Sequence, residues 1–121
     1  MTFSDRLQSV RRGHAGLDEL VDLAELALAQ GEEEAAIPFL MRAAERSSDA
    51  RLWQWTALLQ RALDEHEQAL ASFTRAARIA PLDASIARGR AQVSFEAGLD
   101  AVALFEHARR LAPAKADLLL R

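Results

Sequence analysis

One helix-spaced phrase occurs three times in this chain of 121 residues. Its two strongest copies follow the pattern A-x3-F-x2-A-x4-P and begin at Ala69 and Ala101. A weaker copy begins at Ala36, a similar interval before Ala69, and has Leu40 and Ser48 in place of the Phe and the Pro. A period of this length with two helical segments predicts a solenoid of helix hairpins, in which each hairpin buries its apolar face against its neighbours.

The composition predicts an all-α protein. Apolar residues make up 50% of the chain, and only 5 Gly and 3 Pro interrupt it. Ala, Leu, Glu and Arg favour helix, whereas β-branched and aromatic residues are few. The chain has no Cys, no apolar run of membrane-spanning length and no apolar stretch of a secretory signal near its start. We therefore expect a cytoplasmic protein without disulfides.

Turn and cap residues divide the chain into segments. Gly31, Asp64 and Gly98 are placed to end the first helix of a hairpin, Asp49 can cap the helix that opens the second hairpin, and the third hairpin starts at Asp83. We expect a flanking helix in 1–16, hairpins in 17–49, 50–83 and 84–114, and the start of a further helix in 115–121.

The spacing resembles that of tetratricopeptide repeats (TPR), whose loose consensus is W-x2-L-G-x2-Y in the first helix and A-x3-F-x2-A with a closing Pro in the second. The second hairpin matches this consensus at Trp53, Ala57, Ala69, Phe73, Ala76 and Pro81. The first is a fair match. The third is degenerate, because Arg90 stands where a leucine is usual and its turn between helices is about two residues short. The resemblance implies a right-handed α-α superhelix that binds other proteins.

The repeated phrase also predicts how the hairpins pack. A small Ala lets two helices approach closely, and the large residue four positions later lies one turn away on the same face and fills the space beside it. By residue type and position, we expect Trp53, Phe73 and Phe105 to lie in the core.

The first helices of stacked hairpins line a concave groove that suits a peptide or a helix of a partner protein. In this register the candidate groove residues are Asp18, Val21, Asp22 and Glu25 of the first hairpin, Ser85 of the third, and a central set of Arg51, Gln54, Trp55, Leu58, Arg61, Arg88, Gln92 and Phe95. Segment 17–49 holds nine acidic and two basic residues, whereas 50–121 holds ten basic and eight acidic ones. An acidic ligand stretch over the groove arginines is one hypothesis, and a solvated face is the alternative. For Trp55, an interface anchor and burial against a neighbouring repeat both stay open.

The sequence predicts no enzyme, metal site or cofactor. His14, His66 and His107 lie in different segments without a zinc-binding spacing, and no phosphate-binding glycine loop is present. The net charge of −3 argues against nucleic acid. We expect a protein-interaction scaffold without a membrane anchor, which the terminal helices could join into a homodimer. The alternative is the N-terminal TPR targeting arm of a larger bacterial enzyme, such as a TPR-sulfotransferase.

Overall fold

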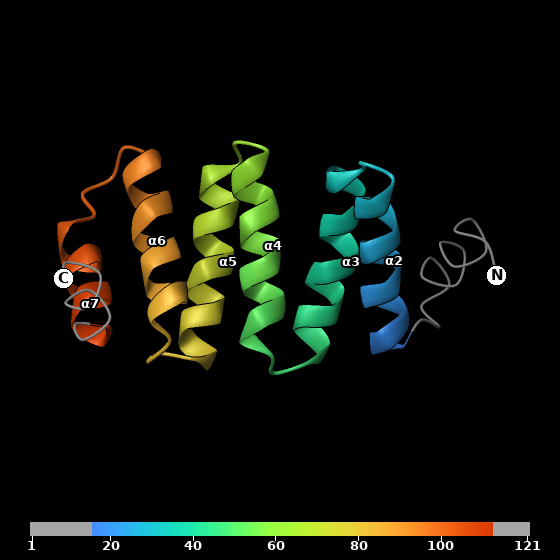
Figure 1. The fold of residues 1–121 in the computed structure, drawn as a ribbon, viewed down its shortest axis with the longest axis horizontal. Helices are drawn as coiled ribbons and strands as arrows, with labels where there is room; N and C mark the ends of the chain where they lie inside the picture. Colours follow the sequence, from blue (N-terminus) through green and yellow to red (C-terminus); the bar gives the residue numbers. More distant parts are fainter. Residues whose placement is uncertain (1–15, 113–121) are drawn as a thin grey trace, which may run out of the picture.

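Six helices stand side by side in a single row in the part of the chain that the computed structural model describes, residues 16–112 (Figure 1). The helices are α2 (Leu17–Ala29), α3 (Glu33–Arg46), α4 (Ala50–Ala62), α5 (His66–Ile79), α6 (Ala84–Glu96) and α7 (Val102–Leu111). Each helix packs against its neighbours in sequence, so the row consists of three antiparallel hairpins. The prediction of an all-α stack of hairpins is confirmed. The helices expected within 1–16 and 115–121 lie outside the described residues.

The same turn closes the first helix of every hairpin. Gly31, Asp64 and Gly98 take a left-handed backbone conformation, with φ of 74°, 60° and 80°. In each turn the next residue's N–H donates to a carbonyl five residues back, as from Glu65 to Gln60 over 2.9 Å. These are Schellman motifs, which satisfy the carbonyl groups that the end of a helix leaves without partners.

Two aspartates begin the first helices of the second and third hairpins, as the sequence predicts. Asp49 accepts a hydrogen bond from the backbone N–H of Arg51 over 2.9 Å. Asp83 accepts from the N–H groups of Ser85 and Ile86 over 2.9 and 3.2 Å. Hydrogen bonds to these residues lower the pKa of both carboxyl groups. The backbone bonds satisfy N–H donors that the first turn of a helix cannot pair.

The turn inside the third hairpin differs from the sequence prediction. We expected a connection about two residues short, but α7 begins only at Val102, four residues after Gly98, whereas α5 begins two residues after Asp64. The reason is that the Schellman turn at Gly98 is kept. The repeated phrase begins at Ala101, only three residues after Gly98, whereas Ala69 follows Asp64 by five residues. Ala101 consequently lies at the N-cap of α7, whereas Ala69 is the fourth residue of α5.

The core runs continuously through the first two hairpins and into α6. One cluster of buried side chains joins α2 and α3, and a second is built mainly from α4, α5 and α6. Helix α4 links them, because Leu52 packs against both clusters. A buried polar pair closes the second hairpin, where Ser72 Oγ donates to Gln60 Oε1 over 2.6 Å.

The expected small-beside-large packing is present in the first two hairpins. Ala36, Leu40 and Ala69 are fully buried and Phe73 is 1% exposed. Phe73 reaches the next hairpin, because a Cβ atom placed on Gly89 would lie only 2.5 Å from its Cε1 and Cζ atoms. A glycine in the middle of α6 therefore gives the Phe73 ring its space.

The prediction that Trp53, Phe73 and Phe105 all lie in the core is correct for two of them. Trp53 is 4% exposed, but Phe105 is 37% exposed. The difference follows from position in the row. Phe73 is covered by α6, whereas α7 is the last described helix and no described helix packs on its outer side.

Candidate functional site

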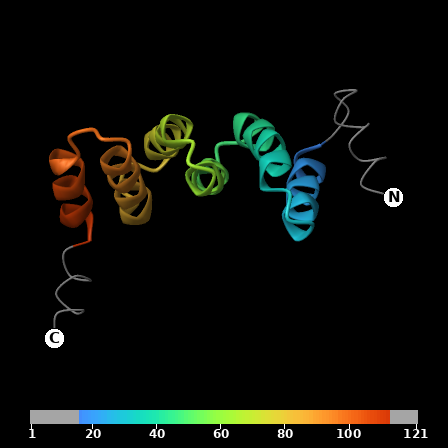
Figure 2. The same cartoon turned by 90° about the horizontal axis from the view of Figure 1, so that it is seen from above.

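The first helices of the hairpins lie along one side of the row. Seen from above, α2, α4 and α6 occupy one side and α3 and α5 the other (Figure 2). The ends of the row bend toward the α4 side, which makes it the inner side of the curve (Figure 2). We call the surface of α4 and α6 on this side the inner face, and we assign to it the groove residues expected from the sequence that lie on these two helices: Arg51, Gln54, Trp55, Leu58, Arg61, Arg88, Gln92 and Phe95.

Two hydrogen-bonded bridges join α4 to α6 across the inner face. Gln54 Nε2 donates to Ser85 Oγ over 3.0 Å, and Ser85 Oγ in turn donates to the cap residue Asp83 over 2.7 Å. Further along, Arg61 Nε and Nη2 each donate to a carboxylate oxygen of Glu96 over 2.7 Å. Two of the predicted groove residues therefore hold neighbouring hairpins together at fixed spacing.

The Arg61–Glu96 pair forms the electrostatic centre of the inner face. The fork of the guanidinium matches both carboxylate oxygens, the strongest geometry for such a pair. Hydrogen bonds from Arg61, reinforced by Gln92, lower the pKa of Glu96 to about 2. His66 Nε2 lies 4.0 Å from the same carboxylate. Glu96 therefore stays ionised at neutral pH.

These pairs leave little unpaired positive charge for an acidic ligand. Arg51 is paired with Asp49 at 3.0 Å, within its own turn. Among the described residues only Arg88, of the three arginines of the acidic-ligand hypothesis, has no carboxylate partner. An acidic ligand would have to displace Asp49 or Glu96. We therefore expect the charges of the inner face to orient a ligand more than they increase its affinity.

Trp55 lies partly buried at the junction of the first two hairpins. It packs against the core cluster of α2 and α3, together with Leu52 and Leu59 of the same helix. Of the two alternatives for this side chain, the structure shows contact with the preceding repeat, and part of the side chain stays exposed.

Leu58 and Phe95 are the apolar side chains that the inner face leaves open. Leu58 is 47% exposed and Phe95 is 65% exposed. Leu58 lines a shallow hollow of about 290 Å³ together with Arg61, His66 and Glu96. Phe95 immediately precedes Glu96 on α6. Leu58 therefore lies beside a fixed ion pair, and Phe95 is a second exposed apolar side chain on the neighbouring helix.

Sequence reasoning missed two residues of this site. Glu96 and His66 contribute to the bridge and the hollow, but neither is among the groove candidates of the sequence. The spacing carries a usable signal for Glu96, because residues at matching positions of successive first helices face each other in a stack. Glu96 is the last residue of α6, and Arg61 is the last residue but one of α4. The two side chains therefore lie at the same end of neighbouring first helices.

The comparisons with known proteins agree with this architecture. Residues 50–81, the second hairpin, match the family model of the tetratricopeptide repeat. The chain has the fold of a tetratricopeptide-repeat protein. No curated protein matches it in sequence.

Several solved TPR structures superpose on most of the chain. A crystal structure of MamA protein aligns with a TM-score of 0.76 and 21% identity, over 95% of this chain and 64% of MamA. The TPR protein YrrB, described as having an unusual peptide-binding site, aligns with a TM-score of 0.73 and 17% identity, over 92% of this chain and 59% of YrrB. The chain thus spans less than two thirds of the length of either structure. At these identities the likeness shows the fold alone.

In residues 16–112 no three His, Asp or Glu side chains are grouped as metal ligands would be. None of the described helices combines the length and apolar character needed to cross a membrane.

Proposed function

We propose that the chain is a protein-interaction scaffold and that the inner face of α4 and α6 binds a peptide or a helix of a partner protein. The observation that carries the proposal is the exposure of Leu58, which shares a hollow with the Arg61–Glu96 pair, and of Phe95 on the adjoining helix. An aromatic ring that is 65% exposed adds little to the packing of α6 but can bury its area against a ligand.

The bridges between α4 and α6 support the same proposal. Gln54–Ser85 and Arg61–Glu96 hold the two helices at a fixed spacing before any ligand arrives. A binding surface that is ordered in advance loses less free energy to ordering when it binds. Leu58 and Phe95 are single apolar side chains on a polar surface, and the opposite charges of Arg61 and Glu96 largely cancel. The ligand expected for this surface therefore has an apolar side chain flanked by polar groups.

A peptide selection with a matched control tests the proposal. Peptides selected from a random phage-displayed library on the wild-type protein are measured by fluorescence anisotropy against Leu58→Asp/Phe95→Asp. The control is Leu82→Asp, because Leu82 is 79% exposed and lies outside the inner face. We expect at least a tenfold loss of affinity for the double variant, no loss for the control, and equal melting temperatures. Equal binding to the double variant would refute the inner face as the binding site.

A further inference from the structure

Helix α2 carries a row of acidic side chains beside the inner face. Asp18, Asp22 and Glu25, which we call the acidic stripe, recur at intervals of four and three residues, and all three are exposed. Each follows the start of α2 by as many residues as an inner-face residue follows the start of α4, so that Glu25 corresponds to Leu58. Because α2 and α4 lie on the same side of the row, the stripe borders the surface proposed to bind a ligand (Figure 2).

The acidic stripe has no partner among the described residues. Helix α2 contains four acidic residues and no basic one, so no ion pair can form within it. In residues 16–112, none of the three carboxylates of the stripe forms an ion pair or accepts a hydrogen bond. On α4, by contrast, Arg51 and Arg61 both have carboxylate partners. The charges of α4 are therefore satisfied within the described part of the protein, and those of the stripe are not.

Folding explains only one residue of the stripe. Asp18 lies in the first turn of α2, where the helix dipole stabilises negative charge. Asp22 and Glu25 lie beyond that turn. Like charges one turn apart on a helix repel each other and destabilise it. The stripe therefore weakens α2 in the free protein, and cations from a ligand would relieve this repulsion.

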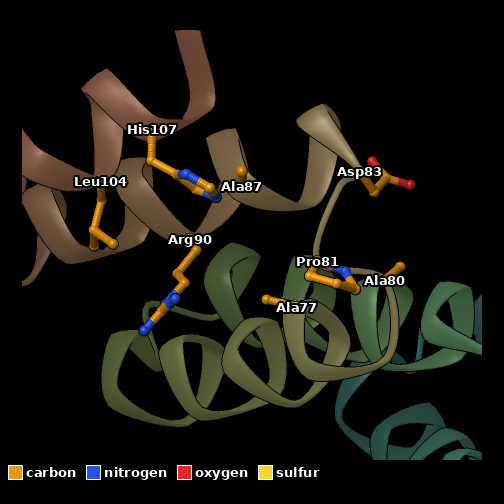
Figure 3. Close-up of a pocket in the computed structure, with 8 residues that line it drawn as sticks. All are labelled: Ala77, Ala80, Pro81, Asp83, Ala87, Arg90, Leu104 and His107. Atoms are coloured by element: carbon orange, nitrogen blue, oxygen red, sulfur yellow. The ribbon is translucent and has the colours of Figure 1, made fainter. Parts of the chain in front are cut away.

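Charge changes sign along this side of the row. The acidic stripe lies on α2, whereas Arg88, the inner-face arginine without a carboxylate partner among the described residues, lies on α6. Between them lies α4 with Leu58, and the charges of Arg61 and Glu96 cancel. Arg90 adds no positive charge to the inner face, because it lies in a hollow of only about 20 Å³ between α5 and α7 (Figure 3). Three unpaired carboxylates thus stand against one unpaired guanidinium.

We propose that the inner face binds a basic amphipathic segment of a partner protein. Its lysine or arginine side chains lie over the acidic stripe, and an apolar side chain of the same segment packs against Leu58 or Phe95. This inference rests on the proposed function and adds the charge of the partner. It replaces the hypothesis of an acidic ligand stretch, because the unpaired charges that a ligand meets here are mainly negative. Complementary charge speeds association and disfavours acidic competitors.

Neutralising the stripe tests the proposal. Asp22→Asn/Glu25→Gln removes two charges and keeps the shape of both side chains, while Asp18 stays because it stabilises the start of α2. The ligand is a peptide from the phage selection, measured by fluorescence anisotropy. Exposed ion pairs contribute little, so we expect the affinity to fall about three- to tenfold. The melting temperature should stay the same or rise, because repulsion within α2 is relieved.

A matched control separates local charge from the net charge of the protein. Glu33→Gln/Glu34→Gln removes the same charge at the start of α3, on the opposite side of the row (Figure 2). Screening by salt limits the reach of such distant charges, so we expect less than about a twofold change in affinity. An equal loss of affinity for the control and for Asp22→Asn/Glu25→Gln would overturn the role of the stripe.

The charge of the peptide gives a second readout. Replacing its lysine and arginine residues by glutamine should weaken binding to the wild type. The same replacement should have little further effect on binding to Asp22→Asn/Glu25→Gln, because both changes remove the same contacts. The wild-type affinity should also fall between about 0.01 and 0.1 M salt, since the screening length shortens from about 30 to about 10 Å. Losses that simply add would contradict a direct contact between peptide cations and the stripe.

One further variant distinguishes failure of this inference from failure of the proposed function. Leu58→Ala/Phe95→Ala removes the apolar contacts without adding charge. Peptides that bind this variant weakly but bind Asp22→Asn/Glu25→Gln as tightly as the wild type would overturn the basic ligand and leave the inner face as the binding site. Inner-face peptides without lysine or arginine would do the same. Peptides unaffected by either variant would overturn both proposals.

Discussion

Single residues set the distances between the hairpins. Gly89 is the clearest case, because the ring of Phe73 occupies the place that its side chain would take. Glycine in the middle of a helix costs about 1 kcal/mol relative to alanine, so its presence in α6 needs a packing reason. The close approach of Phe73 provides that reason. A single hydrogen atom in place of a methyl group therefore decides how closely α5 and α6 can pack.

Gly89→Ala should consequently destabilise the protein, although alanine is the better helix former. The added methyl group would meet a ring that is 1% exposed and cannot move aside. We expect a net loss of about 1–3 kcal/mol, the usual cost of overpacking a core. Urea unfolding measures it, with Ala103→Gly in α7 as a control for helix propensity alone. A gain in stability for Gly89→Ala would show that the two helices are not in tight contact.

The ion pair between Arg61 and Glu96 predicts a pH dependence with a definite sign. The pKa of Glu96 is about 2 in the folded protein, against an ordinary value of 4.5. The unfolded chain therefore binds the proton more readily, and the stabilisation by this pair is complete above the ordinary pKa and is lost as the pH falls toward the folded one.

This contribution is small because the pair is partly exposed, with side-chain exposures of 40% and 26%. We expect about 0.2–1 kcal/mol, as for other surface pairs. The measurement compares the unfolding free energy of the wild type and Glu96→Gln at pH 7 and pH 3. The difference between the two proteins should shrink at pH 3. A difference that stays constant across this range would mean that the pair does not form in solution.

At the scale of elements, the turn between the two helices of a hairpin is the most regular part of the molecule. Gly31, Asp64 and Gly98 occupy the same position of three Schellman motifs. Of these three turns, only that of the second hairpin has a residue with a side chain there. A left-handed conformation costs an L-residue about 1–2 kcal/mol, somewhat less for Asp.

Asp64→Gly should therefore stabilise the second hairpin by about 0.5–1 kcal/mol, because glycine adopts this conformation without steric cost. Asp64→Val, which introduces a β-branched residue, should destabilise it. Thermal unfolding of both variants beside the wild type checks the order. The reverse order would contradict the left-handed turn.

The two phenylalanines of the repeated phrase test the effect of position in the row. Phe73→Ala should cost about 3–5 kcal/mol, because its ring is fully enclosed between α5 and α6. Phe105→Ala should cost only about 1–2 kcal/mol, in proportion to its partial burial. Chemical denaturation of the two variants gives both values. Equal losses would show that Phe105 is covered in solution by something other than the described helices.

The fold was largely predictable at the scale of elements, because period, turns and caps are local signals. The helix starts at Asp49 and Asp83 and the turn at Gly31 are predicted correctly. The exposure of Phe105 was not predictable from the phrase, since burial depends on the next helix and not on the residue itself. The late start of α7 follows from competition between the turn at Gly98 and the phrase at Ala101.

The candidate site was predicted less completely. The eight inner-face residues lie on the expected helices, but the partner of Arg61 could not be seen in the sequence, because Glu96 reaches α4 only through the stacking of hairpins.

At the scale of the whole molecule, charge is distributed unevenly along the row of hairpins. The segment 17–49 is strongly acidic, whereas 50–121 is mildly basic. The inner face of α4 and α6 lies in the basic segment, where Arg61 is paired with Glu96.

The most direct test of the central claim maps a bound peptide on the protein by NMR. The backbone amide signals of the isotope-labelled chain are recorded while a peptide from the selection described above is added. We expect the largest changes in chemical shift on α4 and α6, around Leu58, Gln92 and Phe95. The amide signals of α3 and α5 should not shift. Shifts confined to α3 and α5, with the inner face unaffected, would contradict it.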